Sequence, residues 1–179
     1  MIYLDYQATT PLAPEIFEAM TPWLRDQFAN PHSVHKPGRA AAAVVEAARD
    51  QVAALLPTGG RVVFTSGATE ALNIALFGAA RLMRQRDTKR TRILIPDTEH
   101  AAVRDTAQAM AADGFEPVLL PVDADGLLDL NALTRQLDER TAVLAVMLVN
   151  NEIGVIQPVE ALAGLAHEHG ALFLCDAVQ

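Results

Sequence analysis

The stretch that decides the fold reads Ala142-Val143-Leu144-Ala145-Val146-Met147-Leu148-Val149. An unbroken apolar run of this length predicts a strand that is buried on both faces. Helical patterns flank it on either side, at residues 130–138 and 159–168. Because a strand that alternates with helices needs a crossover connection, the stretch indicates a parallel sheet.

The same alternation extends in both directions along the chain. We expect further strands at residues 61–65, 92–96, 116–122 and 171–174, and further helices at 39–56, 70–86 and 101–112, the first of these ended by a turn at 57–60. The predicted fold class is therefore α/β, with a largely parallel sheet covered by helices on both faces. Ligands of such sheets bind beyond the carboxyl ends of the strands, so we look for chemistry at residues 65–69, 97–100, 150–154 and 176–179.

Composition limits the classes of function. The chain has 179 residues, of which 51% are hydrophobic and 20% charged, and its net charge is -8. It has no apolar run long enough to span a bilayer and no cluster of basic and aromatic residues, which argues against a membrane or a nucleic acid as partner. The first residues lack the pattern of a secretion signal, so we expect a cytoplasmic protein.

The single cysteine, Cys175, lies in the last predicted strand and cannot form an internal disulfide. Alternation along a strand places it on the face opposite to Asp176. We therefore expect Cys175 to be a core residue and not a nucleophile.

A phosphate cradle is one interpretation of Ser66-Gly67-Ala68-Thr69, which joins a predicted strand to a predicted helix. Backbone N–H groups and the positive end of the helix dipole attract anions at such a place. The alternative is structural: Gly67 makes a tight turn and Thr69 caps the helix.

His100 stands where another predicted strand passes into a helix, in Asp97-Thr98-Glu99-His100. Its imidazole could stack on an aromatic ring or move a proton near neutral pH. The alternative is a polar residue in the first turn of a helix. His167 and His169 are two residues apart on one helix and cannot share a metal, and we expect no metal site.

Polar residues also end the last two predicted strands. Asn150-Asn151-Glu152-Ile153-Gly154 either presents an amide to a ligand or forms an Asx turn. Asp176 is a more specific indication of function, because a carboxylate at the end of a buried strand pairs with a cation or shifts its pKa. A protonated pyridine nitrogen is one such cation.

Several separated segments, in their order along the whole chain, resemble the pyridoxal-phosphate-dependent cysteine desulfurases of the class V aminotransferase type. They are Tyr3-Leu4-Asp5-Tyr6-Gln7-Ala8-Thr9-Thr10-Pro11, Asn30-Pro31-His32-Ser33, Phe64-Thr65-Ser66-Gly67-Ala68-Thr69-Glu70, Thr98-Glu99-His100, Val149-Asn150-Asn151-Glu152-Ile153-Gly154 and Asp176-Ala177-Val178-Gln179. The resemblance implies an incomplete large domain of the fold-type I aminotransferase architecture. It also implies conversion of L-cysteine to L-alanine and an enzyme persulfide, which supplies sulfur for iron–sulfur clusters or thiolated nucleotides.

The resemblance also implies a role for individual residues. Ala68 and Thr69 would hold the phosphate of pyridoxal 5'-phosphate, and His100 would stack on its ring and act catalytically. Asp176 would keep the ring nitrogen protonated. The remaining implied contacts are Gln179 to the ring hydroxyl, Asn151 to the ring hydroxyl and the substrate carboxylate, and Asn30 on the substrate side.

By the same resemblance, residues 1–38 form an arm and a substrate-side loop, and residues 39–179 form part of the cofactor-binding domain. Family members continue with a lysine that holds the cofactor covalently, a nucleophilic cysteine on a mobile loop, and a small C-terminal domain. Lys36 and Lys89 lie outside the strand ends and match no motif of the family, and Gln7 stands where many members have Ser or Asn.

We therefore expect this chain alone to be inactive. The full-length protein is expected to be a homodimer that passes sulfur to an acceptor or scaffold protein. The alternatives are a sister enzyme such as selenocysteine lyase or an aminotransferase, and a non-catalytic or split subunit that needs a complementary chain.

Overall fold

The computed structural model describes residues 2–56 and 60–179, so most of the turn expected at 57–60 lies outside the described residues. The chain divides into two compact units, Met1–Phe64 and Thr65–Gln179. The division proposed at residue 38 is one of function and remains a prediction.

The second unit contains a four-stranded parallel sheet, which confirms the predicted α/β class. Its strands are β1 (Arg92–Pro96), β2 (Glu116–Leu120), β3 (Thr141–Met147) and β4 (Leu172–Asp176), in the order β2-β1-β3-β4. The chain moves from β1 to one side and then returns to add β3 on the other. The order of the strands thus reverses between β1 and β3, and ligands bind at the carboxyl ends of the strands beside such a switch point.

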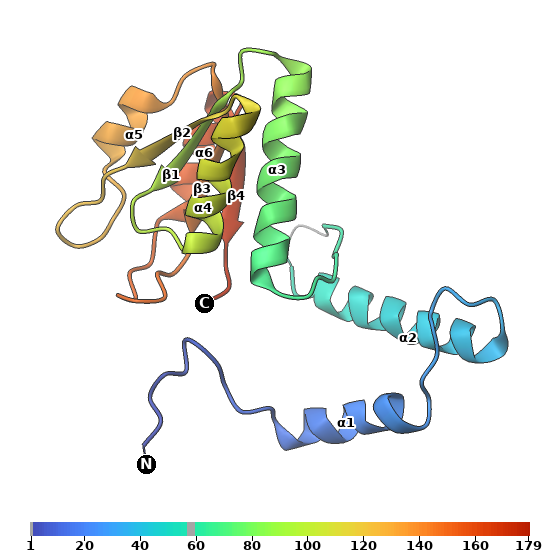
Figure 1. Ribbon diagram of the computed structural model, residues 1–179. Coiled ribbons are helices and arrows are strands. Elements are labelled where there is room, and N and C mark those ends of the chain that lie inside the picture. Colours follow the sequence, from blue (N-terminus) through green and yellow to red (C-terminus); the bar gives the residue numbers. More distant parts are fainter. Residues whose placement is uncertain (1, 57–59) are drawn as a thin grey trace. The chain divides into compact units, whose positions relative to one another are not determined.

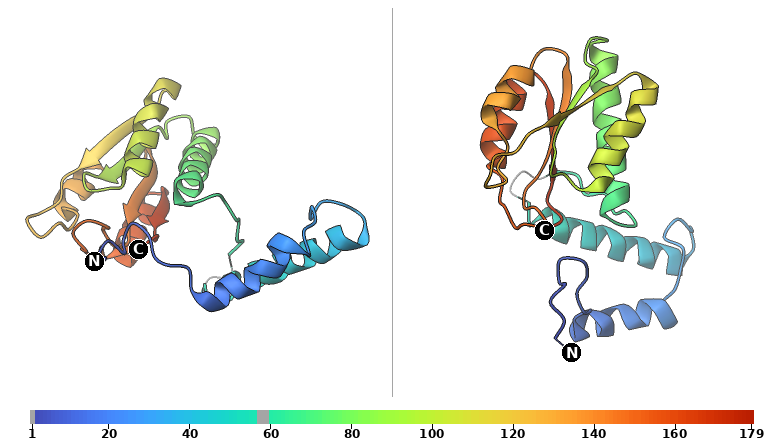
Figure 2. Two further views of the ribbon diagram at one scale, coloured as in Figure 1. Left: turned by 60° about the horizontal axis from the view of Figure 1, so that its bottom comes forward. Right: turned by 60° about the vertical axis from the view of Figure 1, so that its left-hand side comes forward.

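Helices cover both faces of this sheet (Figure 1; Figure 2, right). The helices α3 (Ala68–Arg86) and α4 (Ala101–Ala109) cover one face, and α5 (Leu130–Gln136) and α6 (Val159–Glu168) cover the other. Side chains alternate between the two cores: Ile93 and Ile95 pack with α3 and α4, whereas Leu94 packs with α5 and α6. This double burial explains why the strands are continuous apolar runs.

Most of the predicted elements are present, with changes at their ends. β1 and α6 have the predicted bounds. β2 ends at Leu120 because Pro121 has no N–H group with which to continue the ladder. The predicted helix at 101–112 becomes an α-helix followed by a 3₁₀ turn, η1 (Met110–Asp113), that ends at Gly114 with φ 82°.

Two predictions are wrong, one about a strand and one about a core residue. Residues 61–65 form no strand, and their backbone pairs with none of the sheet's described strands. A sequence rich in β-branched residues forms a strand only where a neighbouring strand supplies partners. Cys175 is exposed and not in the core, because β4 is an edge strand of the sheet that the structure describes.

The first unit contains α1 (Pro14–Arg25) and α2 (Lys36–Ala53). No residue of α1 is buried, and Pro22 lies inside the helix. This helix was not predicted from the sequence. The helix α2 begins at a side-chain cap, since Nδ1 of His35 accepts the N–H of Gly38 at 3.1 Å.

Candidate active site

The candidate site lies at the carboxyl edge of the sheet, where α3 and α4 begin and β4 ends (Figure 1). Gly67 is the N-cap residue of α3, and no side chain caps this end of the helix. Thr69 therefore does not cap α3, contrary to the structural alternative. A Cβ atom at Gly67 would meet nothing within 4 Å, so the side of the turn on which it would lie is open. An uncapped helix start of this kind can bind an anion.

Glu70 lies in the first turn of α3 but is engaged locally. Its Oε2 accepts the Ser66 hydroxyl at 2.7 Å and the Ser66 backbone N–H at 2.6 Å. These two bonds, the hydroxyl first, lower the pKa of Glu70. The carboxylate thus fixes the Ser66 turn that leads into the helix.

Two acidic side chains are buried at this edge, Glu99 and Asp176. Glu99 is 4% exposed and accepts the backbone N–H of Met147 at 2.6 Å. Asp176 is 8% exposed, as expected for a carboxylate at the end of a buried strand, and its Oδ1 accepts the N–H of Val178 at 3.1 Å. Burial first, and then the charge of Asp176, raise the pKa of Glu99 to about 7, whereas the Met147 bond opposes the shift.

Sequence reasoning did not single out Glu99. A glutamate beside a histidine in a helix-start motif carries no signal of burial. The only available signal was its position between a fully buried strand and a helix, two residues before the expected start of that helix.

Asn150 joins the loops that follow β1 and β3. Its Nδ2 donates to the carbonyl of Thr98 at 2.8 Å, and its Oδ1 accepts the N–H groups of Glu152 and Ile153 at 2.9 and 3.1 Å. The Asx turn considered as an alternative is therefore present, and Gly154 completes it with φ 70°. Asn150 is buried, whereas Asn151 is half-buried and donates to its neighbour Glu152 at 3.3 Å.

His100 is the N-cap residue of α4. Its Nδ1 accepts the N–H of Ala102 at 3.1 Å, so the structural alternative also describes a real contact. The side chain is exposed, and Nε2 and the faces of the ring are left for other contacts. A cap and a stacking surface are compatible in one imidazole.

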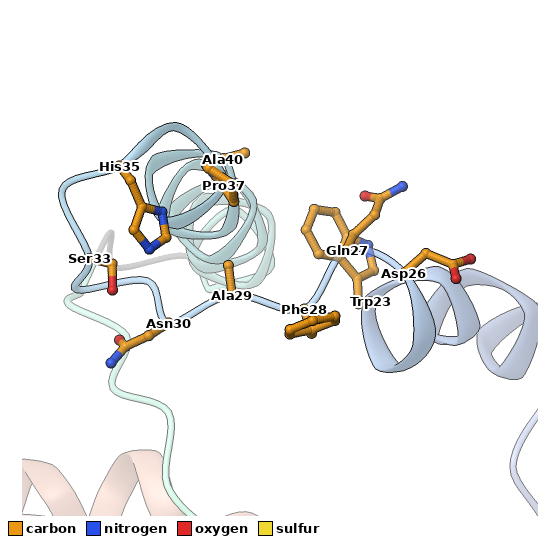
Figure 3. A pocket seen from close by; sticks show the side chains of 10 residues that line it. All are labelled: Trp23, Asp26, Gln27, Phe28, Ala29, Asn30, Ser33, His35, Pro37 and Ala40. Carbon is orange, nitrogen blue, oxygen red and sulfur yellow. The ribbon is translucent and has the colours of Figure 1, made fainter.

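The other expected residues fall in different places. Gln179 is exposed and follows β4 at the same edge. Asn30 belongs to the first unit, where it lines a hollow of about 660 Å³ together with Trp23, Phe28 and Ser33 (Figure 3). This hollow lies in Met1–Phe64 and contains none of the strand-end residues.

Cys175 is exposed at the end of β4, next to Asp176. Desolvation, followed by the negative charges of Asp176 and Glu99, raises the pKa of its thiol. A raised pKa lowers the fraction of thiolate, which is the nucleophilic form. Cys175 therefore lacks the electrostatic surroundings of a catalytic cysteine.

Comparison with known proteins identifies the family. The sequence profile described as aminotransferase class-V matches residues 2–179. The chain belongs to the class-V aminotransferase family. The resemblance read from the separated motifs is thereby confirmed.

Within this family the chain is similar to cysteine desulfurases. It is 46% identical over 180 residues to the cysteine desulfurase IscS of Dechloromonas aromatica, an alignment that covers 99% of the chain and 44% of the relative. It is 42% identical to the mitochondrial cysteine desulfurase of Drosophila melanogaster, covering 99% of the chain and 38% of the relative. The chain thus spans less than half the length of these curated relatives.

Solved structures also match this chain over about half of their own length. A solved structure described as a NifS-like protein superposes with a TM-score of 0.92 at 34% sequence identity. The superposition covers 99% of this chain and 49% of that protein's chain. A structure described as SspA in complex with cysteine gives a TM-score of 0.87 at 32% identity, with 99% of this chain and 50% of that one covered. The fold of the chain is that of roughly half of each protein.

The described residues contain neither a metal-binding cluster nor a membrane-spanning helix. No group of three or more His, Cys, Asp or Glu side chains in this part of the chain is arranged to hold a metal ion. In the same residues, no helix is long and apolar enough to cross a membrane.

Proposed function

We propose that the chain provides the cofactor-binding part of a cysteine desulfurase, which converts L-cysteine to L-alanine and leaves the sulfur as a persulfide on an enzyme cysteine. The proposal rests on the burial of Asp176 without an ion-pair partner among the described residues. Its buried carboxylate ends β4, and it forms no ion pair with any cationic side chain in the described part of the chain. A buried anion without a cationic partner in the protein is costly and suits a ligand that brings its own cation.

The residues present fit pyridoxal phosphate, a ligand with an anionic phosphate and a protonated ring nitrogen. The uncapped start of α3, at Ala68 and Thr69, would hold the phosphate, and Asp176 would hold the proton on the ring nitrogen. When bound, this group supplies an electron sink for negative charge at the Cα atom of an amino acid. A fixed negative charge beside the ring nitrogen is the protein's means of controlling that sink.

The other expected contacts are proposed for the same site. His100 keeps its Nδ1 on the helix cap and offers Nε2 and its ring face to the ligand, where it can hold or move a proton. Asn151 and Gln179 would bind the ring hydroxyl, and Asn151 also the substrate carboxylate. Asn30 is proposed for the substrate side.

We further propose that the chain does not turn over cysteine by itself. Neither of its two lysines, Lys36 and Lys89, matches a motif of the family, and Lys89 precedes β1 at the amino end of the sheet, away from the candidate site. Its single cysteine has a raised pKa and lies on the strand face opposite to Asp176. A lysine and a nucleophilic cysteine from outside these residues would complete the site.

The wider biological setting follows the family. We propose a homodimer in the full-length protein, a sulfur acceptor or scaffold as partner, a role in supplying sulfur for iron–sulfur clusters or thiolated nucleotides, and the cytoplasm as compartment. The similarity to cysteine desulfurases supports a sulfur acceptor as partner, and the relatives named IscS support the sulfur-supply role. One similar protein is named as mitochondrial.

Binding of pyridoxal phosphate tests the proposal directly. We expect phosphorus NMR to show weak binding to the chain, and borohydride reduction to leave no adduct on a single preferred lysine. Asp176→Asn should weaken binding roughly 10-fold or more, because a charge-assisted contact to the ring nitrogen is lost. Asp105→Asn, an exposed change on α4, is the matched control. Equal binding by Asp176→Asn and the unaltered chain would contradict the proposal.

A further inference from the structure

Glu99 is a buried acid whose charge has no counterpart. Its Oε2 atom is buried and has no hydrogen-bond partner in the described part of the chain, while Oε1 accepts the N–H of Met147. No Lys, Arg or His among those residues forms an ion pair with it. An ionised carboxylate is unstable in such surroundings, and a neutral one has a proton to place on the free oxygen.

Asp176 lies near Glu99, because Glu99 follows β1, Asp176 ends β4, and only β3 separates these two strands. Met147, which donates to Glu99, is the register partner of Asp176 in the β3–β4 ladder. The next residue of the chain, Leu148, donates its N–H to the carbonyl of Asp176 at 2.7 Å. The two carboxyl groups are thus placed by the same end of β3, and the charge of Asp176 acts on Glu99.

Other titratable groups do not relieve this pair. Cys175, next to Asp176 on β4, is a thiol and cannot carry a positive charge; desolvation and both carboxylates raise its pKa, which keeps it neutral. His100 follows Glu99, but its side chain is exposed and its Nδ1 faces the first turn of α4. Asp97 is exposed in the loop after β1.

We propose that Glu99 and Asp176 together carry a single negative charge, with the proton on Glu99 and the charge on Asp176. The assignment follows the contacts: the Asp176 carboxylate accepts an N–H bond, whereas Oε2 of Glu99 has none and can carry the proton. Glu99 is then a positioning residue, since as a neutral acid it places no second negative charge beside Asp176. Only the use of that charge, to hold a protonated ring nitrogen, rests on the proposed function.

Carboxyl carbon NMR tests the division of charge without any cofactor. The chain is labelled with carbon-13 at the glutamate side-chain carboxyl, and each resonance is followed against pH. We expect one glutamate to titrate with a midpoint of about 7 and the others nearer the ordinary value of about 4.3. Glu99→Gln should remove that resonance, and Glu160→Gln, on the exposed first turn of α6, should remove an ordinary one.

Asp176→Asn tests the coupling and does not depend on Glu99→Gln being folded. Without the neighbouring charge, the high midpoint should move down by roughly half a pH unit or more, although burial keeps it above the ordinary value. The proposal is overturned if no glutamate of the unaltered chain titrates above about pH 6, or if Asp176→Asn leaves the high midpoint unchanged.

Addition of pyridoxal phosphate separates this proposal from the proposed function. A cation placed at Asp176 offsets the repulsion and should lower the high midpoint. If the high midpoint is present and coupled to Asp176 but does not respond to pyridoxal phosphate, the shared charge stands and the proposed function fails.

Discussion

Glu99 accepts the backbone N–H of Met147 at 2.6 Å, and Met147 is the register partner of Asp176. One short contact therefore links the loop that begins α4 to the ends of both β3 and β4. The loop carries His100, and β4 carries Asp176. The relative positions of these two proposed cofactor contacts therefore depend on Glu99, whose role the sequence alone did not indicate.

The stability of the chain should fall as pH rises from about 4.5 to about 7, because of Glu99. Its pKa is higher in the folded chain than in the unfolded chain, so the stabilising contribution is complete below the unfolded value and is lost as pH rises through the folded value. The change is on the order of 3 kcal/mol, from about 1.4 kcal/mol per pKa unit. Urea denaturation across this range measures it.

Glu99→Gln should flatten this pH dependence, since an amide cannot titrate and its oxygen still accepts the Met147 N–H. Glu160→Gln, at an exposed position, should leave the slope of the unaltered chain in place. A Glu99→Gln variant with an undiminished slope would assign the pH dependence to other groups.

Asn150→Ala should destabilise the chain by about 2–4 kcal/mol, because buried hydrogen-bonding groups lose their partner. The substitution removes the bond to the Thr98 carbonyl and both bonds that close the turn at Glu152 and Ile153. Asn151→Ala removes only a weak contact with Glu152 and should cost well under about 1 kcal/mol. Similar denaturation midpoints for the two variants would contradict this reading of the adjacent asparagines.

Most of the sheet could be predicted from the sequence because buried parallel strands are continuous apolar runs. The stretch 142–149 and the strand Arg92–Pro96 show this, since all residues of β1 and β3 are buried. Residues 61–65 have the same kind of composition but no strand beside them, and composition cannot report a missing neighbour. The exposure of Cys175 has the same origin, because an edge position is a property of the assembled sheet.

The candidate site was predictable at the level of segments, since the order of strands and helices fixes which loops meet at one edge. Asp176 could be identified because a carboxylate is unusual at the end of a buried strand. The roles of Glu99 and Asn150 depend on hydrogen bonds to backbone groups of other loops, Met147 and Thr98. No local pattern carries that information.

Gly38→Ala should disturb the turn that contains Asn30. A Cβ atom at Gly38 would lie 2.3 Å from the carbonyl oxygen of Ser33 and 2.9 Å from that of Asn30, so the backbone of the turn must move. We expect amide NMR signals of residues 30–33 to shift and their hydrogen exchange to accelerate about 10-fold or more, as for a locally opened segment.

The matched control is Gly164→Ala on α6, where a Cβ atom would meet nothing within 4 Å. This change should stabilise the helix by up to about 1 kcal/mol, since alanine is the better helix former. Unchanged exchange in the turn of Gly38→Ala would show that the contact between Gly38 and the turn is looser than the structure indicates.

Cys175 should react slowly with iodoacetamide although it is exposed. Its thiol has a raised pKa, so at pH 8 the folded chain holds less thiolate than the chain unfolded in urea, in which the pKa is near the ordinary value of about 8.5. We expect the folded rate to be several-fold lower at this pH, and its pH profile to have a higher midpoint. Asp176→Asn should raise the folded rate by removing one of the charges that oppose the thiolate, whereas Asp105→Asn should not. Equal rates in the folded and unfolded chain would mean that the two carboxyl groups and the partial desolvation do not restrain this thiol, and Cys175 would then have to be reconsidered as a nucleophile.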